Sequence, residues 1–320
     1  MRCTVGGDGA SSRSSATSKL GRRAHDQPSA SDGLYGHDTR EGKHVTARKW
    51  FGRTSIVIGV LIAAIAVVAS ASAGKQASNP YGLMKPGTLT VGMTLQFKPE
   101  MYLDAKGKPA GYDVVLLKAL AKKWNVKLNI KNLDFNGLIP GLVSKKFDMV
   151  SVGLSATPER RKSISFSRAY VPYAQILAAA KSDTTPATIA AWNVSGKTIT
   201  SLQGSTAEQL VQKTFPNATS HSFPDQNAAF LEVSSGRANG IVVENYLLAQ
   251  FNKSNGNVLK EVPFPKPLHV EYGSYGVQKG NAKLAGALSA FICSVQKSGQ
   301  LAKVYQSTIG APLPAMPACK

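Results

Sequence analysis

Beyond residue 87 the chain alternates short strand-like runs with longer runs of helical spacing, and this order restricts it to an α/β fold. Residues 88–93, 127–130 and 147–152 have strand character, and residues 114–124 and 137–145 between them have helical character. A strand–helix–strand–helix–strand order predicts a parallel sheet whose faces are covered by helices.

The same alternation returns in the second half of the chain. It predicts three strands, at 197–202, 240–243 and 274–278. It also predicts five helices, at 204–213, 228–235, 245–252, 284–297 and 301–309. The chain therefore leaves a first α/β lobe, builds a second and returns to the first. Ligands of open α/β sheets bind beyond the carboxyl ends of the strands, so we expect a site between the lobes that can close like a hinge.

The first 73 residues do not have the composition of a folded domain. Residues 1–48 are rich in Ser, Gly, Arg, Asp and His, so we expect a disordered leader or a true translation start further on, with Val45 as a candidate. Residues 49–73 combine a positive flank, a short apolar run and Ala71-Ser72-Ala73, which predicts a secretory signal peptide cut after Ala73. An uncleaved membrane anchor is the alternative, because the uncharged stretch from Thr54 to Gly74 is just long enough to span a bilayer.

The formal net charge of +20 raises the question of a nucleic-acid partner. The lysines are spread along the chain, apart from short pairs such as Lys122-Lys123 and Lys145-Lys146, and the sequence has no zinc-finger spacing and no aromatic RNA-binding run. Scattered lysines are typical of a solvated surface, so we expect no nucleic-acid binding.

Two cysteines, Cys293 and Cys319, would remain after signal cleavage. An even number in an oxidising compartment is compatible with a disulfide, but spacing alone leaves two free thiols equally open. A bridge would tie the C-terminal tail, residues 312–320, to the late helix at 284–297.

Residues with binding chemistry follow three of the predicted strands. Gly153, Ser155 and Arg160 follow the third strand, and an arginine fork matches a carboxylate with two parallel hydrogen bonds. Gly204-Ser205-Thr206 opens a helix whose N–H groups can hold an anion, and Glu244 offers a counter-charge to an ammonium group. Taken singly, each has an ordinary structural interpretation as a surface arginine, a helix cap or a solvated acid. Together they match the two charged groups of an α-amino acid.

A set of short motifs carries a resemblance to a known family. The motifs are Gly111-Tyr112-Asp113-Val114, Asp134 to Pro140, Lys146 to Met149, Thr157 to Arg160 with Ile164 to Ser167, Gly204-Ser205-Thr206, Gly236-Arg237-Ala238, Tyr275-Gly276-Val277 with Lys279-Gly280, and Ser298-Gly299. From about Gly87 to Ala311 the chain resembles the family 3 extracellular solute-binding proteins, the polar amino-acid receptors of ABC importers.

The resemblance implies a type II periplasmic-binding fold, in which two α/β lobes are joined by a two-stranded hinge. Lobe 1 would comprise residues 87–175 and 272–311, and lobe 2 residues 176–271. The crossings between them are expected near Tyr173–Leu177 and Glu271–Ser274.

The resemblance also implies roles for individual residues. Arg160, helped by the Thr206 N–H, would clamp the ligand carboxylate, and Glu244 would hold the ammonium group where the family usually has Asp. Phe97 and Phe135 would pack against the ligand, with core packing as their alternative. The expected ligand-binding residues are Thr94, Phe97, Phe135, Gly153, Leu154, Ser155, Arg160, Leu202, Ser205, Thr206 and Glu244.

Position 94 bears on the charge of the ligand. Many members of the family have an acid there that contacts the ligand side chain, whereas this chain has Thr94. An unpaired buried charge is costly, so a ligand that is not strongly cationic is favoured, although Glu100 or Glu271 could restore an acid.

These features predict a periplasmic, monomeric receptor that captures an amino acid for an ABC importer permease and meets the membrane only through that permease. We expect no cofactor, no metal site and no catalytic residue, because the five histidines lack metal-ligand spacing and no catalytic pair stands out. The main alternative is an exported enzyme similar to cyclohexadienyl dehydratase, with Glu244, Glu100 or His269 as acid or base. A sensor module for a membrane receptor is a third possibility.

Overall fold

The computed structural model describes residues 79–319, and the leader, the signal-peptide segment and Lys320 lie outside these residues. The described residues belong to one compact unit. Within them, no helix has the length and apolar character that crossing a bilayer requires.

One continuous sheet organises this unit, in the order β5-β1-β6-β12-β7-β10-β8-β9 with β11 paired to β7. Its first end is parallel and is formed by the strands β5 (Lys127–Asn132), β1 (Thr88–Met93) and β6 (Met149–Ser155). Its other end contains β10 (Gly240–Glu244), β8 (Thr198–Leu202) and β9 (Thr219–Phe223), again parallel to one another.

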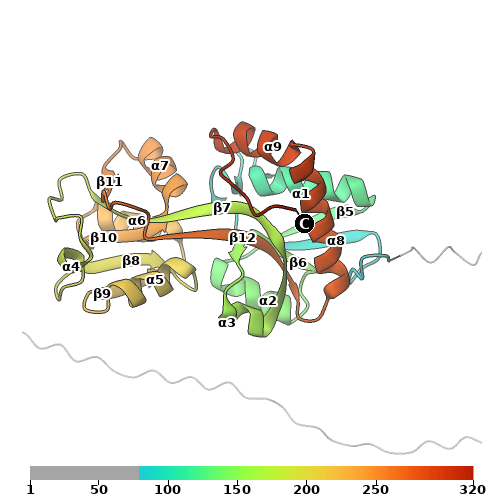
Figure 1. Cartoon of the computed structure of the whole chain (residues 1–320), viewed down its shortest axis with the longest axis horizontal. Coiled ribbons are helices and arrows are strands. Elements are labelled where there is room, and N and C mark those ends of the chain that lie inside the picture. Colours follow the sequence, from blue (N-terminus) through green and yellow to red (C-terminus); the bar gives the residue numbers. More distant parts are fainter. Residues whose placement is uncertain (1–78, 320) are drawn as a thin grey trace, which may run out of the picture. The chain divides into compact units, whose positions relative to one another are not determined.

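Two long antiparallel strands connect these ends. They are β7 (Ile164–Ala180) and β12 (His269–Gln278), and Figure 1 shows them running between the two groups of helices. Strand β12 pairs with β6 from Gly273 onward, and β7 pairs with β10 from Gln175 onward. We therefore refer to residues 79–175 and 272–319 as lobe 1 and to residues 176–271 as lobe 2.

Helices cover both lobes. Lobe 1 contains α1 (Tyr112–Trp124), α2 (Leu138–Val143), α3 (Pro158–Ser163), α8 (Ala282–Lys297), α9 (Gln300–Ile309) and the 3-10 turn Phe135–Gly137. Lobe 2 contains α4 (Ile189–Trp192), α5 (Thr206–Thr214), α6 (Gln226–Ser234) and α7 (Asn245–Ser254). The short strands β2 (Gln96–Phe97), β3 (Met101–Leu103) and β4 (Pro109–Ala110) form a small separate sheet, and β11 spans Leu259–Glu261.

Caps determine where the helices next to the site begin. Helix α3 begins where the Thr157 hydroxyl accepts from the Arg160 N–H at 3.2 Å, with Pro158 in the first turn. Helix α5 begins where the Ser205 hydroxyl accepts from the Glu208 N–H, also at 3.2 Å. Both helices follow a buried strand, so their first turns lie at the carboxyl edge of the sheet.

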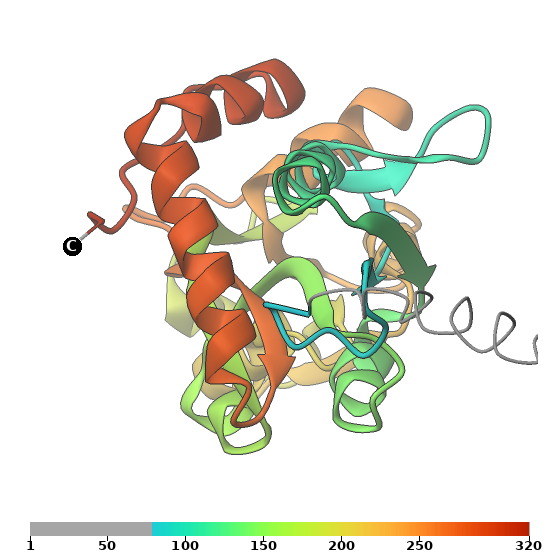
Figure 2. The same ribbon diagram turned by 90° about the vertical axis from the view of Figure 1, so that its right-hand side faces the viewer.

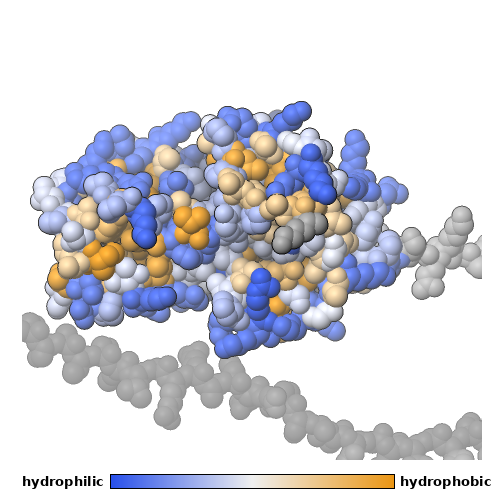
Figure 3. Space-filling model, in the orientation of Figure 1, coloured by the Kyte–Doolittle hydropathy of each residue, from blue (hydrophilic) through white to orange (hydrophobic). Residues whose placement is uncertain are grey.

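The core follows the sheet through both lobes. Strand β6 is buried at every residue, which is typical of a strand covered on both faces. A separate cluster inside lobe 2 surrounds the fully buried Trp192. On the face shown in Figure 3, hydrophilic residues form much of the rim of both lobes.

The C-terminal tail is fastened to lobe 1. Cys319 is bonded to Cys293 of α8, with Cα atoms 5.6 Å apart. The Arg168 guanidinium of β7 donates to the carbonyls of Pro317 and Ala318 at 2.9 and 2.8 Å. The Gln296 side-chain amide of α8 also donates to the Pro317 carbonyl at 3.1 Å, so the tail is held by a covalent bond and by hydrogen bonds from two side chains.

Candidate functional site

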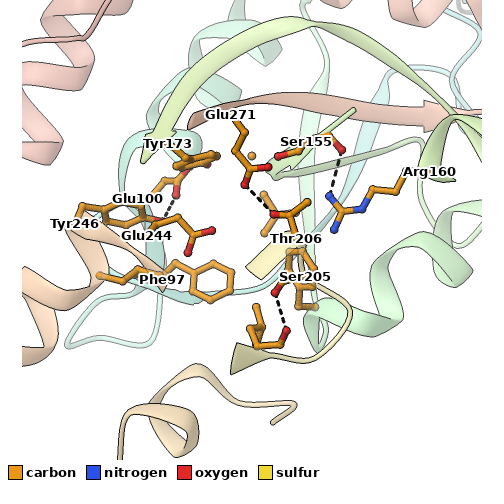
Figure 4. A pocket seen from close by; sticks show the side chains of 15 residues that line it. Phe97, Glu100, Ser155, Arg160, Tyr173, Ser205, Thr206, Glu244, Tyr246 and Glu271 are labelled. Carbon is orange, nitrogen blue, oxygen red and sulfur yellow. Dashed lines mark hydrogen bonds between the residues drawn. The ribbon is translucent and has the colours of Figure 1, made fainter. Parts of the chain in front are cut away.

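A pocket lies where β6, β7 and β12 face the first turns of α5 and α7, and Figure 4 shows its side chains. Both lobes contribute. Nine of the eleven ligand-binding residues expected from the sequence line it: Phe97, Phe135, Gly153, Ser155, Arg160, Leu202, Ser205, Thr206 and Glu244. Six further residues complete the lining: Glu100, Val152, Tyr173, Tyr246, Leu247 and Glu271.

Arg160 is held rigidly at one side of this pocket. Its guanidinium donates to the carbonyl of Ser155 at 3.2 Å and to that of Gly204, in lobe 2, at 3.1 Å. It also lies over the Phe135 ring, 5.7 Å from the centroid. The residue is only 7% exposed, and burial lowers its pKa, although Glu271 and Glu244 oppose that shift. A buried arginine with acids nearby and donors to spare is suited to a carboxylate.

Two acids lie toward the opposite side of the pocket (Figure 4). Glu244 ends β10 at the start of α7, and burial together with the charge of Glu271 raises its pKa to about 7. Glu100 is 2% exposed and accepts hydrogen bonds from the hydroxyls of Tyr173 and Tyr246. Burial, with the charge of Asp113 in addition, raises the Glu100 pKa well above its ordinary value.

A third acid, Glu271 of β12, joins the hinge to lobe 2. Its carboxylate accepts from the Thr206 hydroxyl at 2.7 Å and from the Gln175 amide at 3.0 Å. The Gln175 amide also donates to the Thr206 hydroxyl at 2.9 Å. The first residue of α5 is thus positioned by both hinge strands.

Some of the backbone donors expected at the site already have partners. The Gly153 N–H donates to the Tyr170 hydroxyl at 2.9 Å, and the Gly204 N–H donates to the Glu208 carboxylate at 2.7 Å. The Ser205 hydroxyl donates to the Leu202 carbonyl at 2.7 Å. The N–H groups of the first turn of α5 have no partner inside the helix, so the Thr206 N–H is the donor that remains for an anion.

Two expected residues do not line the pocket. Thr94 is buried, and its hydroxyl donates to the Leu133 carbonyl at 2.7 Å. Leu154 is buried in the core of lobe 1. For Leu154 the reason is strand alternation, because its neighbours Gly153 and Ser155 in β6 line the pocket and successive side chains point to opposite faces of a sheet. Thr94 comes one residue after the end of β1 and is turned to the Leu133 carbonyl instead. Among residues 79–319, no group of His, Cys, Asp and Glu side chains is arranged to hold a metal ion.

Comparison with known proteins agrees with this fold. The sequence model of one family, the bacterial extracellular solute-binding proteins, family 3, matches residues 89–311. The chain therefore belongs to this family, and both the family and the type II fold expected from the sequence are confirmed.

Individual relatives align over most of their length. The ABC transporter arginine-binding protein 1 of Escherichia coli (strain K12) is 26% identical over 71% of this chain and 93% of its own. The crystal structure of an ancestral amino acid-binding protein, a precursor of cyclohexadienyl dehydratase, has a TM-score of 0.65 and 30% identity over 71% of this chain and 97% of its own. An ancestral arginine-binding protein bound to arginine has a TM-score of 0.64 and 33% identity over 69% and 98%.

Proposed function

We propose that this protein captures an amino acid outside the cytoplasm, in the periplasm after signal cleavage, and presents it to the permease of an ABC importer. The observation that carries the proposal is that Arg160 of lobe 1 and Glu244 of lobe 2 line the same pocket. A ligand that bridges them adds contacts that exist only when the lobes are together, so binding favours closure. The relatives named as amino-acid-binding proteins support this function.

The charge of the pocket favours a basic amino acid. Three acids, Glu100, Glu244 and Glu271, line the pocket against a single basic side chain, that of Arg160. A zwitterionic amino acid adds no net charge to this lining, whereas a cationic ligand side chain offers the acids a partner of opposite charge. The relatives named as arginine-binding point the same way. A ligand that is not strongly cationic, expected from Thr94, is the competing outcome, and calorimetry with arginine, lysine and glutamine distinguishes the two.

Replacing the arginine tests the site itself. We expect Arg160→Ala to weaken binding of any α-amino acid by about 100-fold or more, because a buried carboxylate would lose its charged partner. The measurement is isothermal titration calorimetry on the folded variant. Arg161→Ala is the matched control, since this exposed neighbour donates to the Ala156 carbonyl and does not line the pocket. Equal affinities of Arg160→Ala and the native chain would reject this site.

Dehydratase activity is the second candidate, because a general acid needs a raised pKa and two pocket acids, Glu100 and Glu244, have one. We expect a prephenate-like compound to be recovered unchanged after incubation with the protein. Turnover that disappears in Glu100→Gln would replace the receptor proposal with an enzyme.

A further inference from the structure

The net positive charge of the described residues comes from one lobe. Lobe 1 contains 19 Lys and Arg against six Asp and Glu, whereas lobe 2 contains seven against seven. Three of the lobe 1 acids, Glu100, Asp113 and Asp148, are buried, while nearly all of its lysines are exposed. The surface of lobe 1 is therefore more basic than the count alone indicates.

The end of lobe 1 that faces the viewer in Figure 2 has the fewest acids to offset its lysines. This end is built from residues 79–87 and from β5, α1, α8 and α9. These elements contain a single acid, Asp113, and it is fully buried. Among the residues described, no exposed carboxylate on these elements can neutralise the lysines.

Five exposed lysines are neighbours at this end. Lys123 Nζ lies 3.2 Å from the Ser294 hydroxyl of α8, and Lys297 lies one turn further along that helix. Lys122 adjoins Lys123, and the Lys127 N–H donates to the Gly87 carbonyl, which places β5 beside the segment that contains Lys85. We call these five residues, Lys85, Lys122, Lys123, Lys127 and Lys297, the basic end of lobe 1.

The same place is where the described chain begins. Tyr81 stacks on Trp124 at the end of α1, with ring centroids 3.9 Å apart. In Figure 1 this first segment, coloured cyan, lies at the end of lobe 1 away from lobe 2. Only four residues separate Gly74, the end of the uncharged stretch, from Asn79, a reach of roughly 15–20 Å in extended chain. The signal peptide expected from the sequence would therefore tie lobe 1, and not lobe 2, to the membrane during export.

We propose that the basic end of lobe 1 binds the anionic phospholipid surface of the membrane. Exposed lysines within about one Debye length of an anionic bilayer are attracted to it. Lobe 2 has no net charge and remains free to move on the hinge, so the bound protein can still close on its ligand. This contact would hold a released receptor beside the bilayer without a permease, which goes beyond the purely permease-mediated contact expected from the sequence.

Vesicle sedimentation tests the proposal with the mature chain, Gly74 to Lys320. This part suffices for folding, because solved relatives that align over about 70% of this chain consist almost wholly of the corresponding region. In about 0.1 M salt we expect at least tenfold stronger partition onto vesicles with about 30% phosphatidylglycerol than onto pure phosphatidylcholine, and loss of that preference in about 0.5 M salt.

Two charge-matched variants locate the contact. We expect K122Q/K123Q/K127Q/K297Q to lose at least tenfold in partition, since each lysine near an anionic surface contributes about fivefold. The control K181Q/K213Q/K253Q/K266Q removes four exposed lysines of lobe 2 and should stay within about threefold of the native chain. Equal losses in both variants, or retention on a soluble polyanion with no vesicle binding, would overturn the proposal. Ligand titration of the same samples is independent of this outcome, so failure here leaves the proposed receptor function intact.

Discussion

At the scale of single residues, the pocket contains two acids, Glu100 and Glu244, whose pKa values are raised by burial. Glu244 has its pKa raised to about 7 from an ordinary value of 4.5. Its proton is therefore held more tightly in the folded chain than in the unfolded one, and the contribution of Glu244 to the free energy of unfolding falls as the pH rises from about 4.5 to about 7. Ligand binding has the opposite dependence, because an ammonium group requires the ionised form.

This opposition gives a pH prediction. We expect the affinity for an amino acid to strengthen as the pH rises through 7, and to be on the order of tenfold or more weaker at pH near 5.5 than at pH near 8. Calorimetry at several pH values measures it. In Glu244→Gln, binding should be weak and almost independent of pH, whereas a native pH profile in that variant would mean that another group holds the ammonium.

Most of the residues that line the pocket could be found from the sequence because they directly follow strands. Arg160, Thr206 and Glu244 all lie at strand-to-helix junctions, where local order along the chain predicts a position at the sheet edge. Glu100 and Tyr173 offered no such signal. Glu100 precedes a three-residue strand, and Tyr173 lies inside β7, so only the folded chain shows that they meet.

At the scale of elements, the predicted strand at 88–93 coincides with β1, and most predicted helices differ from the observed ones by one or two residues. For the hinge strand β7, the sequence predicted only a crossing between the lobes near Tyr173–Leu177, in its second half. Its 17 residues include Pro172 and a run of alanines, a composition that does not predict a strand. Pairing with β12, β10 and β11 overrides that local preference.

The C-terminal tail gives a prediction at this scale. The bond between Cys293 and Cys319 spans 26 positions, and closing a loop of that size in the unfolded chain corresponds to about 3 kcal/mol. We expect Cys293→Ser/Cys319→Ser to lower the free energy of unfolding by about 2–3 kcal/mol in urea titrations. The native chain under reducing conditions is the control and should match the variant. An unchanged midpoint would show that the hydrogen bonds from Arg168 and Gln296 hold the tail without the disulfide.

At the scale of the whole described unit, the two lobes touch directly. Besides Arg160 with Gly204, the Asn136 side-chain amide donates to the side-chain oxygen Oε1 of Gln203 at 2.9 Å, and the Gln226 N–H donates to the Gln96 side chain at 2.9 Å. Tyr246 of lobe 2 donates to Glu100 of lobe 1. These bonds exist only while the lobes are together, so each shifts the closure equilibrium.

An exposed bond of this set can be removed without touching the pocket. We expect Gln203→Ala to weaken ligand affinity about two- to fivefold, mainly through faster dissociation, because a typical hydrogen bond contributes about 0.5–1.5 kcal/mol and this one is open to solvent. Stopped-flow dissociation rates measure the effect. Gln209→Ala, an exposed glutamine of the same lobe, should bind like the native chain. Identical dissociation rates in both variants would mean that this contact does not bias closure.

The sequence by itself determined the alternation of strands and helices, the family, and the charged pair that suits an amino acid, because each depends on residues close together in the chain. The tertiary structure decided what depends on distant segments meeting. It placed Glu100 and Glu271 in the pocket, excluded Thr94 and Leu154 from it, and bonded Cys293 to Cys319. It also brought the lysines of residues 85–162 together with those of residues 279–303, since lobe 1 is built from both ends of the described chain. Lobe 1 buries three of its own acids, which leaves its surface more basic.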